Sequence, residues 1–445
     1  MNGTEPVAVP EWVKQAGEIR ARWAWVEPGV WTERMLWALE NGVKGGVWFS
    51  LIDKVSRPAT LQEAWRRVAA NGGAAGVDHQ TVEGFRRRET AELEQLVEEL
   101  CTGRYTPRAI RRHYIPKPGS DEERPLGIPT VRDRVVQAAL RIVIEPIFER
   151  EFASNSYGFR PGRGCKDALR EVDRMLKDGK CWVVDADLKG YFDSIPHDRL
   201  MERLEERIQD GRVLELVRAF LQQGIMEDGL VSANERGSPQ GGVISPLLAN
   251  VYLNPLDHAM ARQGHRMVRY ADDLVILCAT EAEANAALQA LEAWVVEEGL
   301  TLHPTKTRIV NVNQPGEGFD FLGYHFERTK RGLMTRWPRR KSLTKYKGRI
   351  RELTHRANGH GMPTIIERCN RVTRGWYEYF RHSHSYTFAT LDGWTRQRLR
   401  AILRKRRGGR GRGRGRDHQR WTNDYFAGLG FFSMQEAHAG ISQSS

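Results

Sequence analysis

Apolar residues near the N-terminus recur at helical spacing. Ala64, Trp65 and Val68 fall on one face of a helix before the Asn-Gly-Gly turn at 71–73, which ends the run. A second helical run, residues 89–100, is strongly acidic. The pattern therefore predicts a mostly helical N-terminal region.

The middle and the end of the chain show different patterns. Between residues 110 and 324, short β-rich runs such as 181–184 and 275–277 mix with helical stretches, which predicts an α/β or α+β core. From residue 339 the periodicity is helical again and predicts a helical bundle. The apolar residues that carry this last pattern are spaced 4, 3, 4 and 4 apart: Ile365, Cys369, Val372, Trp376 and Phe380.

These patterns divide the 445 residues into four parts. We expect a helical extension at 1–95, a mixed α+β body at 96–324, a helical domain at 325–403 and a basic tail at 404–445. A chain of this length has room for about three domains of roughly 150 residues each, so its size is compatible with an enzyme of several domains.

The net charge of +13 is unevenly distributed along the chain. Residues 325–445 carry 28 Lys plus Arg and 8 Asp plus Glu, a balance of +20, whereas residues 1–324 have a balance of −7. This asymmetry is typical of a globular body followed by a region that binds a polyanion. Aromatic residues interleave with the basic ones in the last third, and this mixture suits structured RNA, with its phosphates and unpaired bases.

The segment 404–416 is an Arg/Gly run. It contains eight basic residues and five glycines, with no acidic and no apolar residue. We expect it to be disordered until it binds RNA; a solubilising tail is the alternative. Its candidate RNA-binding residues are Arg404, Lys405, Arg406, Arg407, Arg410, Arg412, Arg414 and Arg416.

Cysteine usage and hydropathy disfavour several classes of protein. The five cysteines are far apart and form no CxxC pair or Cys/His quartet, which argues against a disulfide scaffold and a zinc module. No run approaches roughly 18 apolar residues, and the N-terminus lacks the pattern of a signal peptide. We expect a cytoplasmic, nucleic-acid-associated protein with no membrane partner.

Two acidic sites carry the strongest chemical signal. The β-rich run 182–187 ends on Asp185 and Asp187. Asp272 and Asp273 lie between two further β-rich runs, which predicts a tight hairpin with two carboxylates at its tip. Adjacent carboxylates repel each other and need a cation, and a third carboxylate from a neighbouring strand would complete an oxygen cage that suits Mg²⁺. The alternative is an Asp-Asp pair that only caps the hairpin.

Together these segments resemble the polymerase motifs of reverse transcriptases, and specifically those of group II intron-encoded reverse transcriptase/maturases of the bacterial type. Two further segments are similar to the family's N-terminal extension (73–78) and to its maturase or thumb domain (374–380). The motifs are matched in chain order by the fingers segments 115–129 and 156–163, motif A at 187–193 (DLKGYFD), motif B at 237–242 (GSPQGG), motif C at 270–273 (YADD), motif D at 302–307 and the primer grip at 321–324.

The resemblance implies a right-hand polymerase fold: fingers, a palm with an antiparallel sheet, a helical thumb and a helical N-terminal extension. It implies an RNA-directed DNA polymerase that uses two Mg²⁺ ions, with Mn²⁺ as an alternative, to add deoxynucleotides to a primer 3′-hydroxyl. The implied partners are the intron RNA, an RNA template, a DNA primer or target and dNTPs; a homodimer is left open. No HNH endonuclease pattern follows residue 416, so we do not expect this chain to cut a target strand.

Transferred to this sequence, the resemblance assigns metal binding to Asp187, Asp272 and Asp273, with the Leu188 carbonyl as a further ligand. Family spacing places an aromatic residue five positions after the catalytic acid, and Phe192 satisfies that spacing for Asp187. The ring of Phe192 would then exclude a ribonucleotide 2′-hydroxyl, with an ordinary core position as the alternative.

The resemblance also implies a set of residues that bind the incoming nucleotide. Arg and Lys suit the triphosphate, although each could instead be a solvent-exposed surface cation. The residues in question are Lys117, Arg124, Gln240 and Lys306, beside Phe192.

Template and primer contacts are implied for a third set. Arg160 and Arg163 would either hold the template backbone or order the fingers, and the sequence does not separate these two roles. Phe321, Leu322 and Gly323 correspond to the primer grip.

Three functional hypotheses follow. The first is an active reverse transcriptase that also binds its intron RNA and assists splicing. The second is an RNA-binding splicing factor with an idle polymerase, which the intact DLKGYFD and YADD segments disfavour. The third is a reverse transcriptase adopted by another system, such as a retron, a CRISPR-associated enzyme or a diversity generator.

Overall fold

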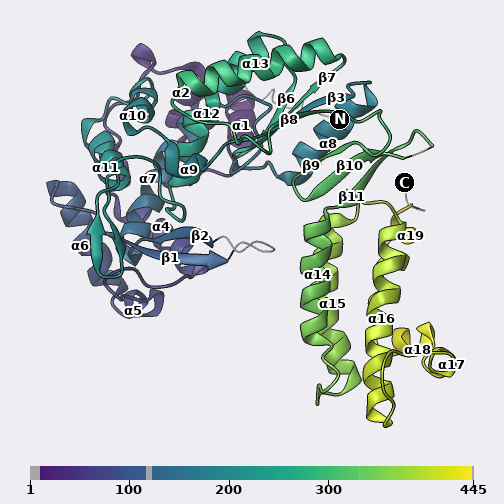
Figure 1. The fold of residues 1–445 in the computed structure, drawn as a ribbon. Coiled ribbons are helices and arrows are strands. Elements are labelled where there is room, and N and C mark those ends of the chain that lie inside the picture. Colours follow the sequence, from purple (N-terminus) through teal and green to yellow (C-terminus); the bar gives the residue numbers. More distant parts are fainter. Residues whose placement is uncertain (1–10, 117–122, 330, 443–445) are drawn as a thin grey trace, which may run out of the picture. The chain divides into compact units, whose positions relative to one another are not determined.

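The computed structural model describes residues 11–116, 123–329 and 331–442 (Figure 1). These residues form two compact units. Unit 1 comprises the chain up to residue 180 together with 186–308, and unit 2 comprises 181–185 together with the chain from 309 onward. Within the described residues, no helix is both long enough and apolar enough to cross a membrane.

The N-terminal part of unit 1 is helical, as the sequence predicts. The helix α4 buries Ala64, Trp65 and Val68 and ends at Asn71, directly before the predicted turn. In chain order the elements are α1 (Glu11–Arg22), α2 (Glu33–Asn41), the 3₁₀ turn η1 (Lys44–Gly46), α3 (Ile52–Val55), α4 (Pro58–Asn71), α5 (Val82–Arg86) and α6 (Glu89–Thr102).

The next long helix, α7 (Val131–Glu149), joins this extension to the rest of unit 1. It is buried on most of its faces, and α4 packs along it. Thr130 caps its N-terminus by accepting a hydrogen bond from the backbone N–H of Asp133 (3.1 Å). The indole N–H of Trp31 donates to the carbonyl of Ile142 (3.1 Å). The helix is therefore held by the extension on one side and by the body on the other.

Unit 1 contains the sheet of the fingers, with strand order β2-β1-β4-β5. Its strands are β1 (Ile110–Pro116), β2 (Glu123–Ile128), β4 (Ile225–Glu227) and β5 (Leu230–Ser232). β1 pairs antiparallel with β2 and parallel with β4, which brings segments more than a hundred residues apart into one sheet.

A second four-stranded sheet carries the acidic motifs, in the order β6-β7-β3-β8. β6 (Met267–Tyr270) and β7 (Asp273–Cys278) form the hairpin that the sequence predicts, with Tyr270 opposite Asp273. The other strands are β3 (Trp182–Asp187) and β8 (Arg308–Asn311). The helices that accompany this part of the chain are α8 (Cys165–Lys177), α9 (Tyr191–Ser194), α10 (His197–Glu205), α11 (Gly211–Leu221), α12 (Ser245–Arg262) and α13 (Glu281–Glu297).

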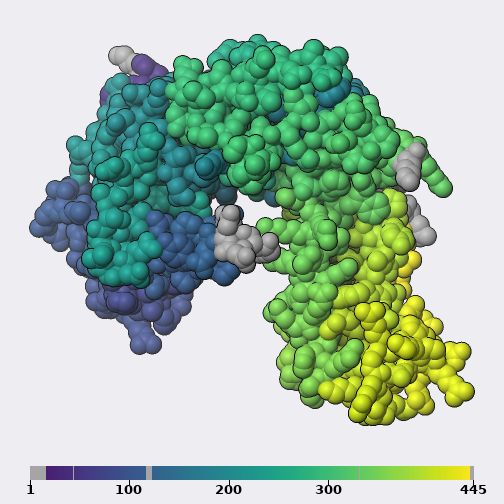
Figure 2. Space-filling model, in the orientation of Figure 1, coloured from purple at the N-terminus to yellow at the C-terminus, as the bar shows by residue number. Residues whose placement is uncertain are grey.

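Unit 2 combines a small antiparallel sheet with helices. The sheet has the order β11-β10-β9, formed by β9 (Gly318–Phe321), β10 (Tyr324–Arg328) and β11 (Met334–Pro338). The helices are α14 (Arg340–Leu353), α15 (Met362–Phe380), α16 (Tyr386–Arg406), α17 (Arg416–Arg420), α18 (Asn423–Gly428) and α19 (Met434–Ser442). In Figure 2 the C-terminal residues, in yellow, lie directly against the green helices of the same unit.

The apolar period seen in the sequence forms the core of this helical domain. Ile365 and Cys369 are fully buried in α15, and Val372 and Trp376 pack against the same core. Trp421, one of the aromatic residues that interleave with basic ones in the last third, is also buried there. The aromatic residues of the last third therefore serve the core more than the composition suggests.

The expectation that the Arg/Gly run 404–416 is disordered is wrong. Its first residues complete the last turn of α16, and Arg416 begins α17. Arg404 forms an ion pair with Asp417 (2.5 Å), and the backbone N–H of Arg414 donates to the same carboxylate (2.9 Å). The run folds because Asp417 and nearby backbone carbonyls accept hydrogen bonds from its arginines, which offsets part of its positive charge.

Candidate active site

Asp272 and Asp273 lie at a sharp reversal of the chain. The turn between β6 and β7 places Ala271 at φ 58°, in the left-handed region that ordinary residues rarely adopt. Asp272 is half-buried, whereas Asp273, the first residue of β7, is exposed. The carboxylates at the predicted hairpin tip thus occupy different environments.

Asp187 ends strand β3 and is tied to the segment of motif D. Its backbone carbonyl accepts a hydrogen bond from the N–H of His303 (2.7 Å), and Leu188 bridges to Leu302. Its carboxylate Oδ2 accepts a hydrogen bond from the Lys306 ammonium at 2.5 Å. Lys306 therefore contacts one of the predicted catalytic carboxylates, although its side chain is largely exposed.

Three other charged residues affect the pKa of Asp272. Burial raises the pKa of its carboxyl group, and the nearby charge of Asp187 raises it further. Arg124 and Lys306 act in the opposite direction and lower the same pKa. Asp187 and Arg124, which are 63 positions apart in the sequence, thus influence the same carboxyl group.

The donor set fits a divalent cation, although the carboxylates are not gathered around one. Among the described residues, no group of three or more His, Cys, Asp or Glu side chains is arranged to hold a metal ion. The carboxylate of Asp187 instead contacts Lys306, whose ammonium group supplies the positive charge. The repulsion that raises the pKa of Asp272 would be relieved by an oxygen-coordinated cation such as Mg²⁺.

Phe192 follows Asp187 by five residues and lies in the short helix α9. Its ring is half-buried and meets the edge of Phe159 with centroids 6.4 Å apart, and Phe159 in turn lies 6.4 Å from the ring of Tyr270. The backbone carbonyl of Phe192 accepts a hydrogen bond from the N–H of Ser238 (2.7 Å). A core position was the alternative; the ring is partly accessible, and it shares the neighbour Phe159 with Tyr270 of the acidic turn.

The motif B loop, between β5 and α12, is hydrogen-bonded to both α9 and the fingers sheet. The Gln240 amide donates to the carboxylate of Asp193 (3.5 Å), and its carbonyl accepts a hydrogen bond from the N–H of Gly127 in β2 (2.6 Å). At Gly241, whose φ is 116°, a Cβ atom would lie 2.3 Å from the carbonyl oxygen of Gly127. Only glycine permits this close approach of loop and strand.

Arg160 and Arg163 hold the fingers loop; Arg160 is buried, whereas Arg163 is partly exposed. The Arg160 guanidinium is buried, donates to Glu149 (2.7 Å) and donates to the carbonyls of Ala153 (2.6 Å) and Ser156 (2.9 Å). Arg163 donates to the carbonyl of Ser154 (2.6 Å). The template assignment is corrected for Arg160, because every nitrogen of its guanidinium bonds within the protein, and the loop-ordering role is favoured for Arg163.

Sequence reasoning missed the network that supports the acidic turn. Arg269, which is fully buried in β6, donates to both carboxylate oxygens of Asp257, to the side-chain carbonyl of Asn250 (3.0 Å) and to the backbone carbonyl of Ala271 (3.0 Å). The Asn250 amide then donates to the carbonyl of Gly158 (2.8 Å). A lone arginine inside an apolar strand, with Asn and Asp seven apart in an apolar helix, was the signal available in the sequence.

The fingers loop contacts the acidic turn directly at Gly158. A Cβ atom there would lie 2.3 Å from the backbone nitrogen of Ala271. Tyr157 adds a backbone hydrogen bond to the carbonyl of Arg269 (2.9 Å). The geometry of the turn is therefore set jointly by β6, by α12 and by this loop.

The remaining candidate residues lie elsewhere. Lys117 is outside the described residues. In unit 2 the side chain of Phe321 is buried in the core, so it cannot itself touch a primer. Leu322 and Gly323 form the turn after β9, with φ angles of 47° and 84°, and the carbonyl of Leu322 accepts a hydrogen bond from the Tyr379 hydroxyl (2.7 Å).

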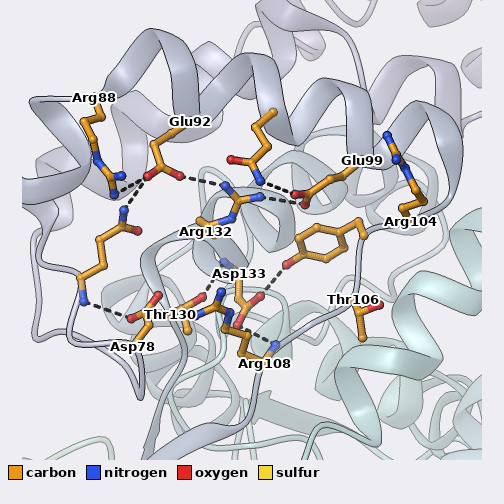
Figure 3. Close-up of a pocket in the computed structure, with 13 residues that line it drawn as sticks. Asp78, Arg88, Glu92, Glu99, Arg104, Thr106, Arg108, Thr130, Arg132 and Asp133 are labelled. Carbon is orange, nitrogen blue, oxygen red and sulfur yellow. Dashed lines mark hydrogen bonds and ion pairs between the residues drawn. The ribbon is translucent and has the colours of Figure 1, made fainter.

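A cavity of about 460 Å³ lies apart from this site, between α6 and the start of α7 (Figure 3). Arg132 bridges Glu92 (2.8 Å) and Glu99 (2.7 Å) across it, and the Tyr105 hydroxyl donates to Asp133 (2.5 Å). Its lining contains four arginines and four acidic residues, so the charges balance. The network holds the helical extension against α7 and selects no ligand of either charge.

Several known proteins resemble this chain in sequence. Residues 115–326 match the family model for reverse transcriptase (RNA-dependent DNA polymerase), and residues 343–421 match that for the group II intron, maturase-specific domain. Protein YkfC of Escherichia coli (strain K12) is 36% identical over 324 residues, which cover 63% of this chain and 83% of YkfC.

The group II intron-encoded protein LtrA of Lactococcus lactis subsp. cremoris is 39% identical over 203 residues. That match covers 45% of this chain but only 33% of LtrA, so the chain corresponds to about a third of this relative. Among solved structures, a partial Cas6-RT-Cas1–Cas2 complex aligns with 56% of this chain and 41% of its own at 25% identity, with a TM-score of 0.37.

Proposed function

Because the chain belongs to the family of group II intron-encoded reverse transcriptases and maturases, we propose that it copies RNA into DNA at Asp187, Asp272 and Asp273 and binds its intron RNA to assist splicing. The family makes it an RNA-directed DNA polymerase with a maturase domain. The observation that supports the catalytic assignment is that three charged residues act on the carboxyl group of Asp272. Asp187 raises the pKa of that group, whereas Arg124 and Lys306 lower it.

Asp187, Asp272 and Asp273, with the Leu188 carbonyl, would hold two Mg²⁺ ions. When bound, the ions would lower the pKa of the primer 3′-hydroxyl and neutralise charge on the phosphates, and Mn²⁺ has the same ligand preferences. Binding requires the carboxylate of Asp187 to leave Lys306, whose ammonium group is then free to meet the triphosphate.

The residues around the acids would bind and select the nucleotide. Arg124 offers a planar fork to the triphosphate oxygens, and Lys306 offers a point charge that can also donate a proton. Gln240 lies on the loop between β5 and α12 and contacts both β2 and Asp193 of α9, where the nucleotide base would stack against backbone. Phe192 would fill the space that a ribonucleotide 2′-hydroxyl needs.

The basic last third would bind RNA. The balance of +20 over residues 325–445 suits a phosphate backbone, and the maturase-specific match lies within it. The Arg/Gly run and the primer-grip turn at 322–323 belong to this region or adjoin it. The proposed partners are the intron RNA, an RNA template, a DNA primer or target and dNTPs.

Primer extension on an RNA template with Mg²⁺ and deoxynucleotides tests the catalytic assignment. The wild-type protein should extend an annealed DNA primer, and Asp272→Asn should lose at least about 10²-fold in rate while keeping its affinity for the primer–template. Asp198→Asn, an exposed acid of α10, is the matched control and should behave like wild type. No product from the wild-type protein would sink the polymerase proposal, and loss of binding in Asp272→Asn would mean that this aspartate is structural.

A further inference from the structure

A small cavity in unit 2 is lined by an unusual concentration of arginine. Its volume is about 160 Å³, and it lies between α14, the segment after α14, α16 and the Arg/Gly run. Four of its eight lining residues are the arginines Arg351, Arg356, Arg398 and Arg412, and the other four carry no charge. All eight belong to the part of the chain that the structure describes, and none of them is acidic.

The positive charge in this cavity is not balanced as it is elsewhere in the same helices. Arg349, two residues from Arg351, forms an ion pair with Glu352 (2.5 Å), and Arg404 forms one with Asp417. In contrast, burial lowers the pKa of Arg398, and the nearby charges of Arg351 and Arg356 lower it further. Holding these guanidinium groups together costs free energy that an anion in the cavity would recover.

The cationic groups are already ordered around one aromatic ring. Arg351 lies 5.7 Å and Arg398 5.5 Å from the ring centroid of Trp394, and Lys347 lies 5.8 Å from it. Arg398 also donates to the Thr354 hydroxyl (2.6 Å) and to its backbone carbonyl (3.2 Å). Arg351 and Arg398 therefore have less side-chain entropy to lose when a ligand binds.

The Arg/Gly run supplies the last wall of the cavity. Arg406 donates to the carbonyls of Asn358 (3.1 Å) and His360 (2.5 Å), which fixes the run to the loop between α14 and α15. After Arg412, Gly413 is buried, and a Cβ atom there would lie 3.0 Å from the Cβ of Arg400. Contacts on both sides of Arg412 thus hold the run close to α16.

We propose that this cavity binds one phosphate group of an RNA backbone, without regard to base sequence. Guanidinium forks match phosphate oxygens in geometry and remain charged at all physiological pH values. The volume is well below the about 300–1,000 Å³ of pockets that enclose drug-sized ligands, so it suits a phosphate group better than a whole nucleotide. RNA is favoured over an acidic protein because the surrounding residues 325–445 carry a balance of +20 and contain the maturase-specific match.

The proposal rests on the proposed function only in naming RNA as the source of the phosphate. Its test is the salt dependence of binding, measured by fluorescence anisotropy with a labelled RNA hairpin over a series of KCl concentrations. Each lost phosphate contact lowers the slope of log K against log salt by about 0.7 to 0.9. The double variant Arg351→Gln/Arg412→Gln should show at least that decrease, with thermal melting used to verify that the protein is folded.

Two single variants serve as controls, because each removes one positive charge outside the cavity. They are Arg349→Gln on α14 and Arg371→Gln on α15, an exposed position. Both should keep the wild-type slope. An unchanged slope in the double variant, or an equal decrease in the controls, overturns the proposal; an unchanged slope is also the outcome expected if an acidic protein is the partner.

Free phosphate is separated from RNA by a second measurement. Sodium phosphate is exchanged for chloride at constant ionic strength, and thermal melting of wild type and double variant is compared. Stabilisation of wild type alone, together with an unchanged RNA slope in the double variant, would make free phosphate the ligand and overturn the assignment to RNA. Primer extension on a short annealed primer–template is measured in parallel at saturating protein concentration. Absence of extension would contradict the proposed function without bearing on the cavity.

Discussion

At the scale of single residues, the environment of Asp272 opposes the ionised form of its carboxyl group, which the proposed metal-binding role would explain. Burial and the charge of Asp187 both raise the pKa of its carboxyl group, so the folded protein disfavours the ionised form that a metal needs. Residues whose environment opposes their charged state are common where a ligand later supplies the compensating charge.

This cost has a measurable dependence on pH. A carboxyl group whose pKa is raised by folding destabilises the fold once the pH exceeds its unfolded pKa, and the effect vanishes in acid where both states are protonated. Asp272→Asn should therefore raise the melting temperature of the metal-free protein at neutral pH, and the gain should shrink as the pH is lowered. A melting temperature equal to wild type at neutral pH, or a gain independent of pH, would contradict this account.

Phe192 makes a second prediction at this scale. Its half-buried ring, five residues after Asp187, should block a 2′-hydroxyl, so Phe192→Ala should weaken discrimination against ribonucleotides by about tenfold to a hundredfold. Competing deoxynucleotides and ribonucleotides in primer extension give the ratio of kcat/KM values. Phe192→Tyr keeps the ring and should keep the discrimination. Unchanged selectivity in the alanine variant would show that Phe192 does not exclude the 2′-hydroxyl.

At the scale of elements, hydrogen bonds from α12 and β6 fix the conformation of the acidic turn. Arg269 joins Asp257 and Asn250 of the helix to the carbonyl of Ala271, and Gly158 adds the fingers loop. Buried polar groups of this kind are retained only when every partner is satisfied, which links the conformation of the turn to the packing of the helix.

A double substitution separates the effect of this network on stability from its effect on the rate of extension. Arg269→Met alone should cost about 3 to 5 kcal/mol of stability, because it leaves the Asp257 carboxylate buried without a partner. Arg269→Met/Asp257→Leu should recover most of that stability but not the rate of extension, since the Ala271 carbonyl has lost its donor. Chemical denaturation and single-turnover extension measure the two quantities, and recovery of both would make the network purely structural.

At the scale of the whole molecule, the chain belongs to the right-hand polymerase fold of reverse transcriptases, and its charge is divided between its parts. Residues 1–324 have a balance of −7 and contain the acids for which we propose metal binding, whereas 325–445 have +20. Much of the second charge has local partners, as Arg404, Arg406 and Arg349 show, so the net charge overstates what is free to meet RNA.

The remaining cations should still make RNA binding strongly dependent on salt. If about six phosphates are contacted, affinity should fall on the order of 10³-fold between about 50 and 200 mM salt. Anisotropy titrations of a labelled primer–template measure this change. A slope near zero would show that the basic region binds its partner by other means, whatever the activity of the polymerase site.

The sequence by itself determined the elements and the motifs, because both depend on short stretches of chain. Two short β-rich runs predicted the YADD hairpin, the period of 3.6 residues predicted the helix α15, and the resemblance of DLKGYFD to the family motif identified motif A. The right-hand fold and the assignment of reverse transcriptase followed from the order of these motifs.

Only the tertiary structure decided which polar groups face each other, since that depends on contacts between distant segments. It placed Lys306 on Asp187, turned Arg160 inward onto Glu149 and folded the Arg/Gly run that composition predicted to be disordered. A local pattern records how polar a residue is, but the partner that satisfies its charge comes from elsewhere in the chain. For that reason the sequence could mark Arg269 as an unusual arginine in an apolar strand, but it could not show the partners of Arg269 or the arginine-lined cavity.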